Sequence, residues 1–301
     1  MIRKLWFKIQ LYRREIFLGL FLIPALIPMV VFQLYPALKA VWFSMTNIAI
    51  MGPHAVDWSF IGLKNFGYLP RDPYFPHSAK LTGYYCAASL VLRFILGFIA
   101  ALFVTSSRSK WRIGLTLLFL IPYIIPGSIK PVLYLSLMDV HSGLYNRVLR
   151  ALHLPPQSWT YERLTESLIS LNVWAGYAFA MIILISALLS IPKEYYEIAD
   201  IYGASRWTKF FRITLPLIKF PIILCLIMIF KEDIDDFTYA YVLGGGGGGD
   251  QPINFKTDIL AVYAYYKAFQ YGELGIGCAI GLIVGIIVFI LTLAQLRMGG
   301  V

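Results

Sequence analysis

Six long apolar segments constrain the fold of this 301-residue chain more than any other feature of its sequence. A helix needs about 20 predominantly apolar residues to cross the hydrocarbon core of a bilayer. The segments that reach this length run near 17–43, 84–106, 113–138, 167–190, 217–240 and 274–296. No series of ten-residue segments alternates as the strands of a membrane β-barrel do. The sequence therefore predicts an all-α polytopic membrane protein with six transmembrane helices.

The composition agrees with a bilayer environment. Charged residues make up 14% of the chain, whereas soluble domains carry about 25%. The formal net charge of +10 does not indicate nucleic-acid binding, because Lys and Arg gather in short connections between the apolar segments. The three cysteines lie inside apolar segments without CxxC spacing, so we expect small buried side chains and no metal site.

The positions of Lys and Arg predict the orientation of the spans. Basic residues are concentrated before the first span, between the second and third, between the fourth and fifth, and after the sixth. Cytoplasmic connections carry such an excess. We therefore expect a basic cytoplasmic N-terminus at 1–16, a six-helix membrane domain at 17–296 and a cytoplasmic tail at 297–301. The first span is too long for a signal-peptide core, so we expect it to be retained.

A polar and basic connection, residues 191–216, separates the fourth and fifth spans. Pro192 and the acidic residues after it suit the start of a helix, and Gly203 is able to adopt the positive φ of a helix stop. Ser205 suits the N-cap of a second short helix. The pattern predicts a helix–turn–helix on the cytoplasmic side. An amphipathic linker that lies on anionic headgroups is an alternative interpretation.

The residues of this connection resemble the cytoplasmic motif of ABC importer permeases, in which EAA is followed by a spaced glycine and by Ile-x-Leu-Pro. The stretch SIPKEYYEIADIYGASRW is similar to the carbohydrate branch of that family. Two positions depart from the motif, because Ile198 stands where a second Ala is usual and Tyr202 where Asp is frequent. Further similar stretches follow in the family's order: LYPALKAVWFSMTNI, FIGLKNFGYLPRDPYF, FLIPYIIPGSIK, YVLGGGG and AFQYGELGIGCAIG. The pattern most resembles the first of the two non-identical permeases in maltose-type sugar importers.

The resemblance implies a permease subunit that forms half of the translocation pathway of an ATP-driven sugar or oligosaccharide importer, in the cytoplasmic (inner) membrane of a bacterium or archaeon. The implied partners are a second homologous permease, two cytoplasmic ABC ATPases, an extracytoplasmic sugar-binding protein and membrane lipid. The chain is expected to be no enzyme and to bind no cofactor, since it lacks a P-loop ending in Gly-Lys-Ser/Thr and leaves ATP and Mg to the partner ATPase. The residues implied in coupling to that ATPase are Glu197, Ala199, Gly203, Ala204, Arg206, Ile213, Leu215 and Pro216.

Ionisable residues inside the spans are candidates for a substrate pathway, because their burial in lipid is costly. They are Arg93, Lys130, Lys231, Glu232, Asp233, Asp235 and Asp236. A helical period places Glu232, Asp235 and Asp236 near one face, where they are able to accept hydrogen bonds from sugar hydroxyls beside Tyr239. Internal ion pairing, or a helix that ends near Phe230, explains the same residues.

A second candidate patch lies on the fourth span. It consists of Asn172, Trp174 and Tyr177, although an aromatic belt at the membrane interface explains the two rings equally well. Arg93 and Lys130 favour either an acidic sugar or paired structural roles.

An ion-coupled secondary transporter that uses the intramembrane carboxylates is the main alternative function. Such folds often contain internal repeats, and no convincing repeat is visible in this sequence. An enzyme is disfavoured, since the four histidines fall in predicted outer loops without a known motif.

Overall fold

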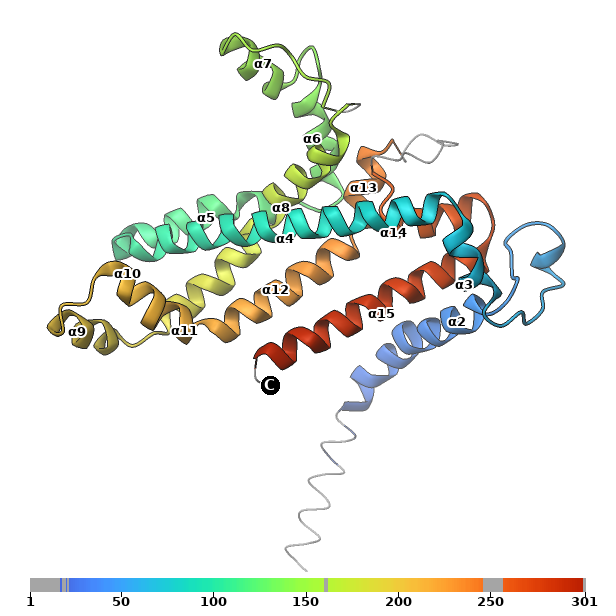
Figure 1. Ribbon diagram of the computed structural model, residues 1–301, viewed down its shortest axis with the longest axis horizontal. Coiled ribbons are helices and arrows are strands. Elements are labelled where there is room, and N and C mark those ends of the chain that lie inside the picture. Colours follow the sequence, from blue (N-terminus) through green and yellow to red (C-terminus); the bar gives the residue numbers. More distant parts are fainter. Residues whose placement is uncertain (1–16, 18–19, 21, 160–161, 246–256, 300–301) are drawn as a thin grey trace, which may run out of the picture.

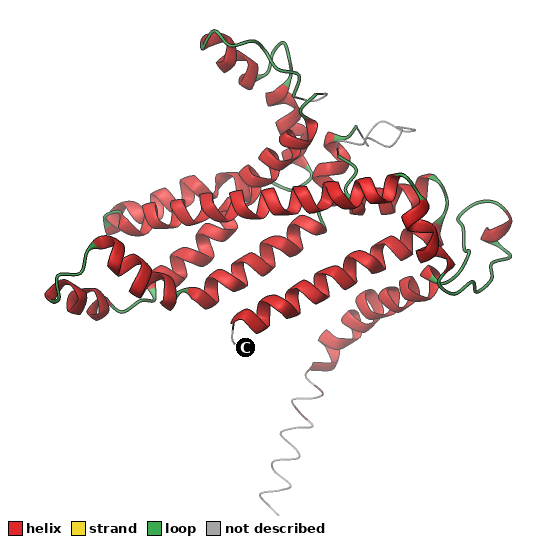
Figure 2. Cartoon of the chain, viewed as in Figure 1, coloured by secondary structure: helices red, strands yellow, loops and turns green. Residues whose placement is uncertain are grey.

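The computed structural model describes residues 22–159, 162–245 and 257–299, together with Phe17 and Leu20. These residues form helices and loops with one isolated bridge, between Thr46 and Phe60, and no strand occurs among them (Figure 2). The long helices lie side by side in an elongated bundle; some shorter helices lie at its two ends, and others project from its side (Figure 1). The all-α class is therefore confirmed. The expected N-terminal segment 1–16 and four of the consecutive glycines, 246–249, lie outside the described residues.

Residues 22–29 are helical and continue into the first named elements. The elements are η1 (Val30–Leu34), α2 (Tyr35–Ser44), η2 (Pro53–Ala55), α3 (Lys64–Tyr68), η3 (Leu69–Arg71), α4 (Tyr74–Ser106), α5 (Ser109–Ile124), α6 (Ile129–Met138), α7 (Leu144–Ala151), α8 (Leu164–Leu189), α9 (Lys193–Ile201), α10 (Arg206–Lys209), η4 (Phe210–Thr214), α11 (Leu215–Leu217), α12 (Lys219–Ile234), α13 (Phe237–Leu243), α14 (Leu260–Tyr265), η5 (Tyr266–Gln270) and α15 (Leu274–Gly299).

Among the described residues, four helices are long and apolar enough to cross a membrane as single elements. They are Leu22–Ser44, Tyr74–Ser106, Leu164–Leu189 and Leu274–Ala294. Two more spans are bent pairs: α5 and α6 meet at 94°, and the segment Arg206–Leu217 meets α12 at 66°. The expected six spans are reached when each bent pair is counted as one span.

Two of the expected helices are interrupted, and the prediction of continuous helices over 113–138 and 217–240 is wrong. Pro126 disfavours the helical conformation at the residue before it, and Ile125 is extended, with φ −59° and ψ 133°. The fifth span stops at Ile234. Asp236 then caps the next helix, since its side chain accepts a hydrogen bond from the backbone amide of Tyr239 at 3.2 Å.

The helices α4 and α8 pack closely in the interior of the bundle. A Cβ atom on Gly97 would lie 2.7 Å from the carbonyl oxygen of Tyr177 and 2.5 Å from the Cβ of Ala180. Small residues allow such close approach between membrane helices, where packing takes over from the hydrophobic effect. The contact holds Arg93, one turn before Gly97, against the polar part of α8.

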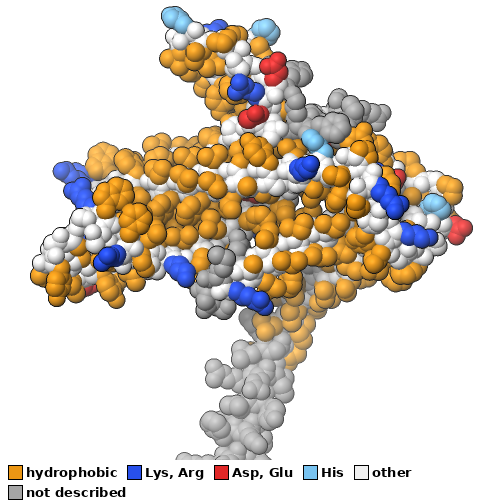
Figure 3. All heavy atoms as spheres, in the orientation of Figure 1, with side chains coloured by type: hydrophobic (Ala, Val, Ile, Leu, Met, Phe, Trp, Pro, Cys, Tyr) orange, Lys and Arg blue, Asp and Glu red, His pale blue; other side chains and the backbone are white. Residues whose placement is uncertain are grey.

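The outer flank of the bundle is apolar. Large hydrophobic side chains cover most of the visible side (Figure 3), and none of the most apolar stretch of the Leu22–Ser44 span is buried within the chain. Exposed apolar surface on this scale is stable only against lipid or another protein. The helices are therefore built for a membrane.

Candidate functional site

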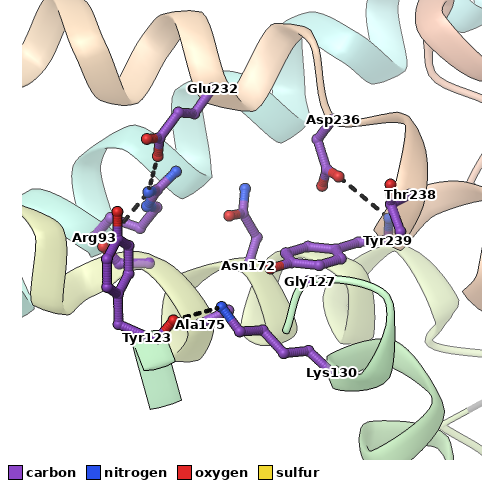
Figure 4. Close-up of a pocket in the computed structure, with 11 residues that line it drawn as sticks. Arg93, Tyr123, Gly127, Lys130, Asn172, Ala175, Glu232, Asp236, Thr238 and Tyr239 are labelled. Atoms are coloured by element: carbon purple, nitrogen blue, oxygen red, sulfur yellow. Dashed lines mark hydrogen bonds and ion pairs between the residues drawn. The ribbon is translucent and has the colours of Figure 1, made fainter. Parts of the chain in front are cut away.

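A polar cavity of about 300 Å³ lies inside the bundle, where α4, α8 and α12 meet the two breaks in the chain (Figure 4). It is lined by Arg93, Tyr123, Gly127, Lys130, Asn172, Ala175, Gly176, Glu232, Asp236, Thr238 and Tyr239. Non-helical backbone at membrane depth is tolerated where it lines such a cavity or is buried in protein. Gly127 and Asp236, which lie in the breaks after α5 and α12, are part of this lining.

Arg93 is the centre of a charged network that joins three helices. Its Nη1 donates to Asp233 Oδ1 at 2.5 Å, and its Nη2 donates to Glu232 Oε2 at 2.6 Å. Nη2 also lies 3.4 Å from the carbonyl oxygen of Gly176 on α8. Arg93 and Asp233 are buried, whereas the side chain of Glu232 is 44% exposed. A charge buried in a membrane span needs such partners.

Asn172 and Tyr85 extend this network to the second carboxylate of the cavity. The Asn172 amide donates to Asp233 Oδ1 at 2.8 Å and to the hydroxyl of Tyr85 at 2.6 Å. Tyr85 in turn donates to Asp236 Oδ2 at 2.5 Å. Each of these hydrogen bonds joins side chains from different elements. The network therefore fixes α4, α8 and the break after α12 relative to one another.

In Figure 4, Lys130 lies across the cavity from Glu232 and Asp236. Its Nζ is 3.4 Å from the carbonyl oxygen of Tyr123 and 5.5 Å from the centre of that ring. Among the described residues it forms no ion pair. No group of three or more His, Cys, Asp or Glu side chains in the described ranges is arranged to hold a metal ion.

The structure divides the residues expected in a substrate pathway into two groups. Asn172, Glu232, Asp236 and Tyr239 line the cavity. Asp235 does not, because α12 ends at Ile234 and the Asp235 carboxylate turns to Lys231, 3.5 Å away. The prediction that the three carboxylates share one helical face is therefore wrong. Internal ion pairing, the alternative interpretation, holds for Glu232 and for Asp235.

Trp174 and Tyr177 lie away from the cavity. Both line an apolar groove on the flank of α4 and α8. The hydroxyl of Tyr177 donates to the carbonyl oxygen of Phe119 at 2.9 Å, and the ring of Trp174 lies 5.9 Å from that of Tyr134. Sequence reasoning missed Tyr85 and Tyr123, because a tyrosine in an apolar span carries no signal of what its hydroxyl will meet.

The connection at 191–216 is a second candidate site, and it has the expected helix–turn–helix form. Gly203 has φ +67°, and the Ser205 hydroxyl accepts a hydrogen bond from the backbone amide of Thr208 at 3.1 Å. The positive φ at the glycine and the N-cap serine are both confirmed. An ion pair of 2.6 Å between Lys209 and Asp200 holds the two helices together.

The tip of this connection is apolar and exposed, whereas its base is anchored. Tyr202 is 85% exposed and Trp207 72% exposed, and Trp207 stacks on Phe211 with ring centres 6.0 Å apart. At the base, Phe210 lies against Phe98 of α4. An anchored loop with protruding aromatic side chains suits docking to another protein.

The residues that the resemblance assigns to coupling are spread over this connection. Ala199 is buried in α9 beside the exposed Glu197, and Ala204 donates its amide to the carbonyl oxygen of Ala199 at 2.9 Å. The others lie beyond the turn, with Arg206 in α10, Ile213 in η4, and Leu215 and Pro216 in α11. Their role in coupling stays a prediction.

Comparison with known proteins decides the family. Residues 93–298, which include both candidate sites, match the family model described as binding-protein-dependent transport system inner membrane component. The chain belongs to this family. Its members are components of the inner membrane, in agreement with the several spans of this chain.

Individual relatives match along almost the entire chain. The trehalose/maltose transport system permease protein MalF of Thermococcus litoralis is 30% identical over 293 residues, which cover 96% of each chain. The crystal structure of a bacterial ABC transporter involved in the import of the acidic polysaccharide alginate has a TM-score of 0.79, 25% identity and 98% coverage of both chains. A second structure of such a transporter, in complex with an alginate pentasaccharide-bound periplasmic protein, shares the fold with a TM-score of 0.79 and 24% identity, over 95% of this chain and 94% of that chain.

Proposed function

We propose that this chain is the permease subunit of an ATP-driven sugar importer and forms half of its translocation pathway. The observation that carries this proposal is the polar cavity inside the family-matched part of the bundle. Its amide, carboxylate and ammonium groups suit a ligand rich in hydroxyls, and the rings of Tyr123 and Tyr239 suit the apolar faces of a sugar. Trehalose, maltose and alginate, the compounds named for the relatives above, are all carbohydrates.

The connection at 191–216 provides the docking site for a separate ATPase. That subunit, and not this chain, binds ATP and Mg. The exposed aromatic tip of the connection enters a groove on that subunit, and its anchored base transmits the movement to α4 and α12. Coupling requires that the contacts differ between the two states of the ATPases. This assignment places 191–216, the basic segment 1–16 and the tail 297–301 in the cytoplasm.

The remaining partners are proposed from the family and are consistent with the surfaces of the chain. The apolar flank and the unburied Leu22–Ser44 span face lipid and a second, homologous permease that supplies the other half of the pathway. Two ATPase subunits bind the pair from the cytoplasm. A sugar-binding protein delivers the substrate from the opposite side, as the periplasmic protein in the complex described above suggests.

The experiment that tests coupling compares Glu197→Lys and Gly203→Asp with a matched control, Gly52→Asp. Gly52 also has positive φ, +82°, so Asp strains the backbone there as it does at Gly203, although a Cβ meets nothing within 4 Å. Gly52 lies at the other end of the bundle (Figure 1). We expect both loop variants to reach the membrane at wild-type levels and to lose sugar uptake, while the control retains it. Normal uptake in either loop variant counts strongly against the coupling role. Uptake that survives loss of the ATPase but collapses with the ion gradient identifies a secondary transporter instead.

A further inference from the structure

The charged groups around the cavity come from several elements, and their signs do not balance. Arg93 on α4 and Lys130 on α6 are the cations, and Glu232, Asp233 and Asp236 in and after α12 are the carboxylates. The elements α5 and α8 contribute only neutral groups to the lining. Two cations against three carboxylates leave a formal excess of one negative charge.

The charge of Arg93 is already paired with two carboxylates of the chain. Both terminal nitrogens already donate to carboxylates, at 2.5 and 2.6 Å, and the guanidinium is buried against Gly176, where an added Cβ would overlap it. A ligand carboxylate at Arg93 would compete with Glu232 and Asp233 for a guanidinium whose side chain is only 3% exposed. Lys130 is then the one cation of the described lining that is free of a carboxylate, and Asp236 and Glu232 face the same space.

Glu232 combines the properties that a charge-selecting residue needs. Its side chain is 44% exposed, and its Oε2 is engaged by Arg93. The carboxylate is therefore able to accept hydrogen bonds from sugar hydroxyls. Because one guanidinium serves both Glu232 and Asp233, the pair of carboxylates keeps a formal negative charge that repels an approaching anion. We propose that the cavity selects neutral sugars and excludes uronic acids, with Glu232 as the specificity-determining residue. This inference rests on the proposed function and names its substrate class.

The size of the discrimination follows from Coulomb's law. One unit charge at roughly 8 Å, at an effective dielectric constant of about 20, changes binding on the order of tenfold or more. Replacing Glu232 by Gln removes one negative charge and leaves Arg93 with one carboxylate. The ratio of uronate to neutral-sugar affinity is expected to rise about tenfold. Lys130→Met is expected to lower the same ratio, because it removes the cation nearest to an incoming carboxylate.

The test uses the transporter assembly that co-purifies with this chain, in lipid nanodiscs and without a binding protein, so that only the permease cavity selects the ligand. Saturation-transfer NMR titrations compare maltotriose, galactotriose and mannotriose with the corresponding triuronates. A neutral sugar is expected to bind at least about tenfold more tightly than its uronate. The matched control is Asp235→Asn, a carboxylate three residues further along that pairs with Lys231 outside the cavity, and it is expected to keep the wild-type ratio.

The outcomes separate the inference from the proposed function. Equal or tighter binding of uronates overturns the inference and leaves a sugar permease in place. An unchanged ratio in Glu232→Gln, or a ratio that changes equally in Asp235→Asn, refutes the role of Glu232. Binding of neither class by an assembly that also imports no sugar contradicts the proposed function itself.

Discussion

The Arg93 network makes a quantitative prediction about stability. In Arg93→Met the guanidinium is lost, and the completely buried Asp233 keeps only the amide of Asn172 as a partner. Removal of one partner from a buried ion pair costs about 3–5 kcal/mol. The unfolded state in a membrane also finds partners for its polar groups, which reduces the difference, so we take about 3 kcal/mol.

The assay is thermal unfolding of the purified assembly in nanodiscs. For domains of 150–250 residues, 1 kcal/mol corresponds to roughly 2–4 °C in Tm, so Arg93→Met should lower Tm by roughly 6–12 °C. The double variant Arg93→Met/Asp233→Leu removes the orphaned charge as well and should recover most of the loss, since replacing both partners of a buried pair is often neutral.

Lys231→Met is the control for loss of a cation from the same region. Lys231 pairs with Asp235 at 3.5 Å, and the two side chains are 67% and 53% exposed. Exposed pairs contribute little, so its Tm should stay within about 2 °C of wild type. An equal shift in Arg93→Met and Lys231→Met, or a double variant no more stable than Arg93→Met alone, would refute the account of Arg93 as the buried partner of Asp233.

Two further changes test the packing and the outer end of the bundle. Gly176→Ala places a Cβ against the Arg93 guanidinium, so it should destabilise the fold by about 1–3 kcal/mol and lower Tm. Gly285→Ala, whose Cβ meets nothing within 4 Å, should not lower Tm. Equal Tm values for the two variants contradict the close contact. Burial would raise the pKa of Asp72, which precedes α4, but hydrogen bonds from Tyr263, the amide of Tyr74 and Lys267, with the charge of Lys267, outweigh it and lower that pKa. A lowered carboxyl pKa stabilises the fold at pH values above the unfolded pKa. The Tm advantage of wild type over Asp72→Asn should therefore be complete near neutral pH and should shrink as the pH falls below about 4. An advantage as large at pH 3 as at neutral pH contradicts this assignment.

The sequence by itself determined the features that depend on local chemistry. The length of an apolar segment decides whether a helix is able to span a bilayer. The six spans predicted from these lengths agree with the structure when each bent pair is counted as one span. The turn at Gly203 and the cap at Ser205 also depend on residues within one or two helical turns of each other. These elements appear in the structure where their residues predicted them.

Only the tertiary structure decided which charges meet and which face of each helix lines the cavity. Arg93 and Asp233 are separated by 140 residues, and nothing in the sequence near either one specifies the other as its partner. On α8, Asn172 faces the cavity while Trp174 and Tyr177 face the flank, and a helix that is apolar on all sides has no periodicity to reveal this. The breaks at Pro126 and Asp236 then turn Lys130 and Tyr239 toward the same space. The breaks themselves have local causes, but which side chains meet across the cavity depends on packing between helices, which acts only after each helix has formed.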